Sequence, residues 1–450
     1  MKKDTITEGR ILPALLKFAL PFLAAYILQS LYGAVDLWVV GKFSGAAAVA
    51  AVSTGTQVTQ IVTSLVTGLT TGSTVLIGEY AGAGKGDKVK RTIGTTLTVF
   101  AVVAVIISIL MIVFEKPLLT VLRTPEESFE LTALYVTICA AGNIFVCGYN
   151  AISAVLRGCG DSRRPMYFVG IACGINVVLD IIFVRYLGMG VAGTAFATII
   201  SQGFSMFFAA FYLRKKDFIF DFRWKSFIPD KRIAGRLAGI GVPLSLQEIM
   251  VRISFLYVTL VMNSAGLYAA GVVGIGAKYD IFAMLAGNAL AGSLAAFTAQ
   301  NYGAHKLDRA GKALLYSLVF DLIVSMAFFA WAQLSPETMI GVFSHDENII
   351  AAGIPYFLTA SFDWPVVTSL FILNGYLNGR QKTVWTMVSV CFGALALRIP
   401  MTWYVGHHYP QDIGTLGKVA PTVSAVMLFY TLIYVIIIIC RDRRKEVEKA

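Results

Sequence analysis

Charged side chains are scarce in this chain of 450 residues. Only 14% of the residues are Asp, Glu, Lys or Arg, whereas 57% are hydrophobic. A soluble protein typically has about a quarter of its residues charged, because its surface has to be polar. The scarcity excludes a soluble enzyme. The formal net charge of +11 therefore has to be explained within a membrane protein, although a soluble chain with that charge would suggest a nucleic-acid partner.

Cysteine pairs and the motifs of common enzymes are also lacking. The six cysteines form no C-x-x-C pair, and none lies in a loop that we assign to the outside below, so neither disulfides nor a thiolate metal site is expected. The chain has no G-x-x-x-x-G-K-[ST], H-E-x-x-H or G-x-S-x-G motif, and its adjacent His407 and His408 lack metal-ligand spacing. We expect no direct use of ATP, no enzymatic chemistry and no cofactor beyond a coupling ion.

Apolar runs long enough to cross a bilayer dominate what is present. A hydrocarbon core of about 30 Å requires roughly 20 apolar residues in a helix. Twelve such runs lie at residues 13–40, 47–77, 93–114, 131–155, 165–187, 190–213, 237–263, 267–298, 313–334, 349–376, 383–404 and 416–440. The sequence therefore predicts an all-α polytopic membrane protein with twelve transmembrane helices. The first ten residues do not have the pattern of a signal peptide, so we expect the first run to be retained as a helix.

Basic residues are distributed unevenly over the predicted loops. The loops on the side of the N-terminus hold 29 Lys and Arg residues, and the opposite loops hold only five. Those five are Lys42, Lys116, Arg123, Arg185 and Lys418. The positive-inside rule then predicts that both termini are cytoplasmic. Topology accounts for the excess positive charge, and we expect no nucleic-acid partner.

The two halves of the sequence resemble each other. When the sequence is shifted by 221 residues, the pattern G-A-x-K-x-D at 82–87 coincides with the same pattern at 303–308. Pro21 and Pro243, each early in the first span of its half, agree with that shift within one residue. Both copies begin in the cytoplasm, so the predicted repeat is parallel, with its axis along the membrane normal.

The longest stretch without a membrane-competent run separates six spans from six. We therefore predict an N-lobe at residues 1–213, a cytoplasmic linker at 214–232 and a C-lobe at 233–450, related by a pseudo-two-fold axis. Two such lobes around a central cavity are the architecture of an alternating-access carrier. A channel or a membrane enzyme can also be duplicated, so the repeat alone does not decide the function.

Several motifs follow one another in an order that resembles a known family. The first span contains P-x-x-x-A-x-x-L-x-x-L-Y-G-x-V-D, from Pro21 to Asp36. Later come G-K-F-S-G-A-A-A-V-A-A-V-S at 41–53, L-R-G-C-G-D-S-R-R-P at 156–165, N-V-V-L-D at 176–180 and Q-N-Y-G-A at 300–304. Together they resemble the multidrug and toxic compound extrusion (MATE) transporters, with N-V-V-L-D most similar to the DinF-like and related bacterial branch.

The resemblance implies a secondary active multidrug efflux antiporter. Such a protein exports organic cations and amphiphilic drugs in exchange for inward H⁺ or Na⁺, by alternating access of two lobes. The resemblance also implies a bacterial cytoplasmic membrane, a small-molecule substrate, contact with membrane lipid and no obligatory protein partner, so we expect a monomer. The alternative is a flippase for a lipid-linked oligosaccharide or another amphiphilic lipid of the same superfamily.

Carboxylates inside the predicted spans carry the functional hypothesis. A charge at the bilayer centre costs about 2.5–3.5 kcal/mol on insertion scales, so each one needs a function or a partner. Asp36 lies in the outer third of the first span, Asn176 and Asp180 share one face of the fifth, and Thr198 reaches a comparable depth in the sixth. These oxygen-rich side chains predict a cation-coupling site, with H⁺ bound to a carboxylate or Na⁺ bound to all four residues. The competing interpretation is that Asn176 and Asp180 only hydrogen-bond neighbouring helices.

The resemblance assigns the same four residues to the cation site of the N-lobe. It also suggests Glu248 and Asp363 as a second candidate site, for a cation or the substrate, because some branches of the family use acids in these two helices. An internal ion pair of Glu248 with Arg252 is the competing interpretation. Four further charges lie in predicted spans: Lys278, Asp280, Asp321 and Arg398. We expect compensated pairing across helices for them, with a place in the lining of the C-lobe cavity as the alternative for Lys278 or Arg398.

Overall fold

The computed structural model describes residues 6–122, 124–215, 218–264, 266–409 and 412–447. Within these residues the regular structure is helical throughout, without a strand. Eleven helices are long and apolar enough to cross a membrane, and a pair of helices bent by 40° supplies a twelfth span. The predicted all-α membrane fold is therefore confirmed. Five basic residues used to orient the chain lie outside the described residues: Lys2, Lys3, Arg123, Lys216 and Lys449.

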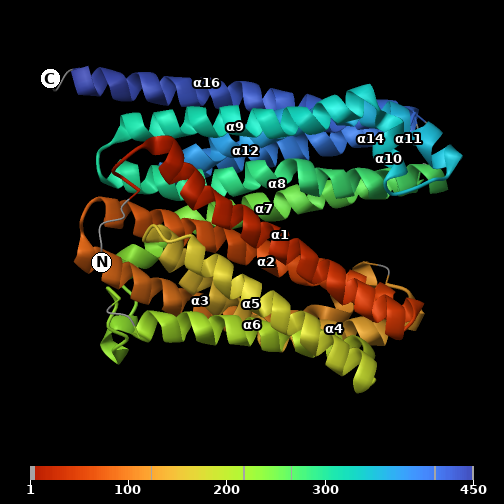
Figure 1. The fold of residues 1–450 in the computed structure, drawn as a ribbon, viewed down its shortest axis with the longest axis horizontal. Coiled ribbons are helices and arrows are strands. Elements are labelled where there is room, and N and C mark those ends of the chain that lie inside the picture. Colours follow the sequence, from red (N-terminus) through yellow and green to blue (C-terminus); the bar gives the residue numbers. More distant parts are fainter. Residues whose placement is uncertain (1–5, 123, 216–217, 265, 410–411, 448–450) are drawn as a thin grey trace. The chain divides into compact units, whose positions relative to one another are not determined.

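The first half of the chain contains six long helices (Figure 1). They are α1 (Ile11–Phe43), α2 (Ala46–Gly82), α3 (Gly86–Val121), α4 (Glu126–Gly158), α5 (Arg163–Asp180) and α6 (Gly190–Lys215). Two short segments accompany them, the π-helix η1 (Ile181–Tyr186), which continues α5, and the 3-10 helix η2 (Trp224–Phe227). The turn between α1 and α2 places Gly45 at φ +83°, in the region that favours glycine.

The second half repeats this order with more interruptions. Its helices are α7 (Lys231–Ser264), α8 (Leu267–Gly303), α9 (Leu307–Leu334), α10 (Pro336–Gly341), α11 (Glu347–Ala360), α12 (Asp363–Gly379), α13 (Thr383–Cys391), the π-helix η3 (Phe392–Arg398), α14 (Ile399–His408), α15 (Ile413–Gly417) and α16 (Val419–Val447). The turn before α8 uses Gly266 at φ +115°. This glycine occupies the position that the 221-residue shift assigns to Gly45, so the repeat extends to the turn geometry.

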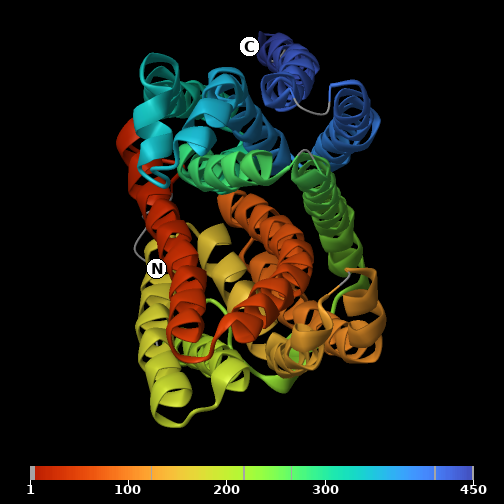
Figure 2. The ribbon, with the colours of Figure 1, turned by 90° about the vertical axis from the view of Figure 1, so that its right-hand side faces the viewer.

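The helices form two compact units whose borders fall inside α1 and α7. The first unit is Leu20–Ser245, and the second combines Ile6–Ala19 with the chain from Leu246 onward. Each border lies within three residues of a helix proline, Pro21 or Pro243. These units differ from the predicted lobes at 1–213 and 233–450. In Figure 2, helices α5 and α6 of the first unit lie side by side, in agreement with their contacts.

The predicted linker at 214–232 is a packed part of the first unit where it is described. The side chains of Phe218, Phe220 and Phe227 join a core cluster formed with residues of α2, α3, α4 and α7. Thr98 Oγ1 donates to the Phe227 carbonyl oxygen at 2.6 Å. The aromatic residues of this segment bury apolar surface against α3, so the segment is part of the hydrophobic core of the first unit.

The start of α7 also belongs to the first unit. A Cβ on Gly72 of α2 would lie 2.8 Å from the Cα of Gly241, so the two helices approach backbone to backbone. Ser245 Oγ donates to the Leu65 carbonyl oxygen at 2.6 Å, and Arg236 forms an ion pair with Glu79 at 2.8 Å. These contacts explain why the first unit extends to Ser245 and does not end with α6.

Candidate cation site

The four residues of the predicted N-lobe site come together in the first unit. Asp36 on α1 and Asn176 and Asp180 on α5 have buried side chains, and Thr198 on α6 is half-buried. Thr198 Oγ1 donates to Asp36 Oδ2 at 3.3 Å. With the Asn176 amide turned so that its nitrogen faces the acids, that nitrogen lies 3.1 Å from Asp36 Oδ1 and 3.3 Å from Asp180 Oδ2. One amide therefore bridges the carboxyl groups of two helices.

The local sequence of α5 explains how its two polar residues reach the same place. Asn176 and Asp180 are one helical turn apart and fully buried, whereas Val178 between them is 55% exposed. Asp180 is the last residue of α5, and the π-helix η1 begins at Ile181. The change of helix type follows directly after the carboxyl group.

Tyr32 and Ser201 complete the contacts between α1 and α6. The Tyr32 hydroxyl donates to the Thr198 carbonyl oxygen at 3.1 Å and lies 2.8 Å from Ser201 Oγ. Ser201 Oγ in turn donates to the same carbonyl at 2.8 Å. Neither Tyr32 nor Ser201 was among the residues predicted for this site. The available signal was the three-residue spacing of Ser201 from Thr198, which places both on one helix face.

The electrostatics of the site suit a small cation. Neither Asp36 nor Asp180 forms an ion pair with Lys, Arg or His within the part of the chain that the structure describes. Asp180 Oδ1 is buried and has no hydrogen-bond partner. Two carboxyl groups without a basic neighbour favour either a shared proton or a bound cation. Carboxylate, amide and hydroxyl oxygens are also the hard ligands that Na⁺ requires.

The second candidate site is not assembled in the same way. Asp363 is buried at the start of α12, directly after the bend that follows α11. Glu248 on α7 is half-buried. No hydrogen bond or ion pair joins these two acids within the described residues. Their role as a second site therefore stays a prediction.

The other charges inside the spans form no close ion pairs in the described residues. Asp280 accepts a hydrogen bond from Trp364 Nε1 at 2.8 Å, and Arg398 donates to Ser254 Oγ at 3.2 Å. Lys278 is exposed, and Asp321 is completely buried. None of these four charges has a partner of opposite charge within 4.0 Å. Polar neighbours contact Asp280 and Arg398 directly, and compensation across helices is present at longer range between Arg398 and the acids Asp280 and Asp363.

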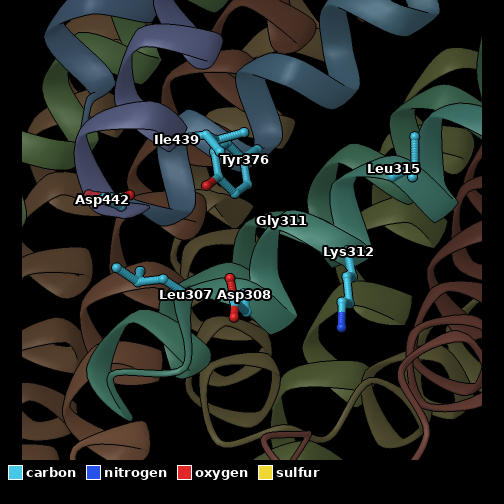
Figure 3. Close-up of a pocket in the computed structure, with 8 residues that line it drawn as sticks. All are labelled: Leu307, Asp308, Gly311, Lys312, Leu315, Tyr376, Ile439 and Asp442. Atoms are coloured by element: carbon cyan, nitrogen blue, oxygen red, sulfur yellow. The ribbon is translucent and has the colours of Figure 1, made fainter. Parts of the chain in front are cut away.

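A pocket lies at one end of the second unit (Figure 3). It is lined by Leu307, Asp308, Gly311, Lys312 and Leu315 of α9, by Tyr376 of α12, and by Ile439 and Asp442 of α16. Asp442 forms an ion pair with Arg380, which follows α12. None of the predicted site residues lines this pocket, and no sequence motif pointed to it.

Comparisons with known proteins match nearly the whole chain. A family model described as MatE matches residues 21–182 and 243–404, one match in each half. The probable multidrug resistance protein YoeA of Bacillus subtilis is 25% identical over 424 residues, which cover 93% of this chain and 91% of that protein. The probable multidrug resistance protein NorM of Thermotoga maritima is 25% identical over 443 residues, covering 96% of this chain and 93% of its own.

A solved structure described as MATE in the bent conformation has the same fold. Its TM-score is 0.92 at 22% identity, with 99% of each chain covered. At this level of identity the likeness concerns the fold alone. Both halves of the fold and their order are shared.

Proposed function

Because the chain belongs to the MatE family of membrane transporters, we propose that it is a secondary active efflux antiporter. Its substrates are organic cations and amphiphilic drugs, and inward movement of H⁺ or Na⁺ drives their export. The names of the relatives from Bacillus subtilis and Thermotoga maritima support the substrate class. The observation that carries the coupling assignment is the pair of buried carboxyl groups, Asp36 and Asp180, bridged by Asn176 without a basic neighbour.

The site binds its cation through the carboxyl groups of α1 and α5. Two ionised carboxylates side by side in a dry pocket repel each other, so a proton or Na⁺ that enters relieves the repulsion. A proton is held by a carboxyl oxygen, while the Asn176 amide nitrogen donates to both acids. With Na⁺, the amide turns over and presents its oxygen, and Thr198 Oγ1 supplies a further ligand. The Asn176 side chain thus serves either ion by its orientation.

Cation binding changes the contacts between three helices. Thr198 of α6 is linked to α1 twice, to Asp36 through its side chain and to Tyr32 through its carbonyl oxygen, so a change at Asp36 acts directly on α6. One charge moving through 100 mV releases about 2.3 kcal/mol, which supports roughly a fifty-fold substrate gradient. One coupled cation per cycle is therefore enough for useful export.

The experiment compares two site variants with a matched control. Asp36→Asn and Asp180→Asn remove one carboxylate each and keep the side-chain shape, whereas Asp87→Asn changes an exposed acid at the start of α3. Each variant is reconstituted in proteoliposomes, and drug efflux is measured with a pH gradient and a Na⁺ gradient imposed separately. We expect gradient-driven efflux to fall to background in both site variants and to stay at the wild-type level in the control.

The same assay distinguishes the alternatives. The gradient that restores efflux in wild-type vesicles identifies the coupling ion. Normal efflux by both site variants would contradict the coupling assignment. Transfer of a fluorescent lipid-linked oligosaccharide without any drug flux would instead favour the flippase.

A further inference from the structure

An acidic residue at the centre of α9 has no role in the site described above. Asp321 lies fourteen residues after Leu307, the first residue of this 28-residue helix, which is roughly 21 Å along the axis. Its side chain is completely buried, and neither carboxyl oxygen has a hydrogen-bond partner among the residues that the structure describes. An ionised carboxylate without donors or a counter-charge costs far more in an apolar interior than a neutral acid does.

The surroundings of Asp321 are three helices of the second unit. Helices α8, α9 and α12 pack against one another and run side by side in Figure 1. Gly287 of α8 makes this approach possible, because a Cβ there would lie 2.7 Å from Thr368 Cβ and 3.1 Å from Asp321 Oδ1. The Thr368 hydroxyl of α12 is the polar group beside the carboxyl group.

The hydroxyl groups near Asp321 lie within hydrogen-bond distance of backbone carbonyl oxygens. Thr368 Oγ1 donates to the Trp364 carbonyl oxygen at 2.7 Å. One turn away on α9 in either direction, Ser317 Oγ donates to the Ala313 carbonyl oxygen and Ser325 Oγ to the backbone carbonyl of Asp321, both at 2.9 Å. With its hydrogen directed at the Trp364 carbonyl oxygen, Thr368 Oγ1 can accept a hydrogen bond from a protonated carboxyl group, whereas donating to a carboxylate requires the hydroxyl to rotate.

In the described part of the chain, no basic side chain forms an ion pair with Asp321 that could neutralise an ionised carboxylate. The elements packed against α9 carry ten titratable side chains: Tyr268, Lys278, Tyr279, Asp280 and Tyr302 on α8, Glu337 on α10, Glu347 and Tyr356 on α11, and Asp363 and Tyr376 on α12. None of them forms a hydrogen bond or an ion pair with Asp321 within the described residues. Compensated pairing, which the sequence led us to expect, is therefore replaced by an isolated acid.

We propose that Asp321 is a proton-binding site of the second unit, in which the protonated carboxyl group donates a hydrogen bond to Thr368 Oγ1. Loss of the proton requires the Thr368 hydroxyl to rotate and donate to the carboxylate, which removes its bond to the Trp364 carbonyl oxygen. Trp364 is the second residue of α12 and also holds Asp280 through its ring nitrogen. Protonation of Asp321 thus acts on the start of α12, at the bend with α11.

Difference infrared spectroscopy tests the protonation directly. The full-length protein is prepared in the Asp36→Asn, Asp180→Asn background, so that the acids of the first unit cannot contribute. We expect a carbonyl stretching band of a protonated carboxyl group at neutral pH that disappears in Asp321→Asn. Asp308→Asn, which changes an exposed acid of the same helix, should leave the band unchanged.

A second variant tests the hydrogen bond and does not depend on the folding of Asp321→Asn. Thr368→Val removes the acceptor, so the band should shift to higher frequency without being lost. A band that is the same in the presence and absence of Asp321 would overturn the proposal. So would a band that stays unchanged at every pH at which the protein is folded, because a binding site has to exchange its proton. An unshifted band in Thr368→Val would contradict the assigned acceptor.

Discussion

Tyr32 shows how a single hydroxyl group positions the cation site. Its oxygen contacts the Thr198 carbonyl and Ser201 Oγ, both on α6, while its own helix carries Asp36 one turn further on. The hydroxyl touches neither carboxyl group through a hydrogen bond that the structure records, so its role is to position Thr198. Such a residue should affect the site through the geometry of α6.

Replacing Tyr32 with Phe should weaken this arrangement without removing any acid. The loss of one net hydrogen bond costs about 0.5–1.5 kcal/mol, and the buried oxygen atoms left behind add to that cost. We expect a lower melting temperature and a reduced apparent affinity for the coupling cation, measured by thermal unfolding and by the cation dependence of efflux. Tyr186→Phe, at a 70% exposed tyrosine, is the control. Equal cation dependence of Tyr32→Phe and wild type would contradict a positioning role.

The residues of the site were predictable because polar groups are rare inside apolar runs. Asp36, Asn176, Asp180 and Thr198 could be selected by depth along their spans alone, and the structure brings them into contact. The orientation of the Asn176 amide, and the absence of an ion pair at Asp321, could not be predicted. Both depend on distances between helices that the sequence pattern does not contain.

At the scale of helices, the segment after α6 was the least predictable element. Its lack of a membrane-competent run suggested a linker, and where the segment is described its phenylalanines pack against α3 in the first unit. Gly94 of α3 is in close contact with this segment: a Cβ on Gly94 would lie 1.8 Å from the Ser226 carbonyl oxygen. The backbone of the segment therefore approaches α3 as closely as a glycine permits.

Gly94→Ala should consequently destabilise the protein. The added methyl group has to displace backbone atoms, and overpacking of this kind costs typically about 1–3 kcal/mol. Gly235→Ala is the matched control, since a Cβ on Gly235 of α7 meets nothing within 4 Å and alanine favours the helix. Thermal unfolding of both variants gives the comparison. A melting temperature of Gly94→Ala at or above that of Gly235→Ala would show that the segment is not held against α3.

The interruptions of the helices were predictable to different degrees. The predicted span at 349–376 is divided into α11 and α12, and Pro365 gives the reason. Proline has no N–H to donate to the carbonyl group of Ser361, so an uninterrupted helix is disfavoured there. The π-helix η3 has a comparable signal, because Pro400 follows it and has no N–H to donate to the carbonyl group of Ala396. The π-helix η1, which begins directly after Asp180, has no proline nearby, and helical propensity gives no indication of it.

For the whole molecule, a carrier and a pore differ in how flux depends on concentration. A carrier changes conformation once per transported molecule, so the efflux rate should saturate with substrate concentration and reverse when the ion gradient is reversed. Proteoliposomes containing the wild-type protein are suitable for this measurement. A linear, non-saturating flux with large electrical currents would be the behaviour of a channel and would contradict the proposed antiport.

The twelve spans could be predicted because the bilayer imposes a length and a composition on each one. The borders of the compact units could not, since they depend on which helix faces meet. Lys306 Nζ donates to the Thr7 carbonyl oxygen at 3.0 Å and Arg309 Nη1 to the Gly9 carbonyl oxygen at 2.7 Å, within the second unit. These contacts join residues separated by about 300 positions in the sequence.

The division of α1 and α7 at the unit borders has a consequence for biosynthesis. The first unit extends to Ser245, inside α7. A ribosome that has just completed α6 has not yet synthesised this part of α7, so the first unit is still incomplete at that point. The opening stretch from Ile6 to Ala19 must wait until α8 and α9 have emerged before it finds its neighbours. Neither half therefore contains all the residues of one compact unit. If the two halves are expressed separately, we expect membrane proteases to degrade each one unless both are present together.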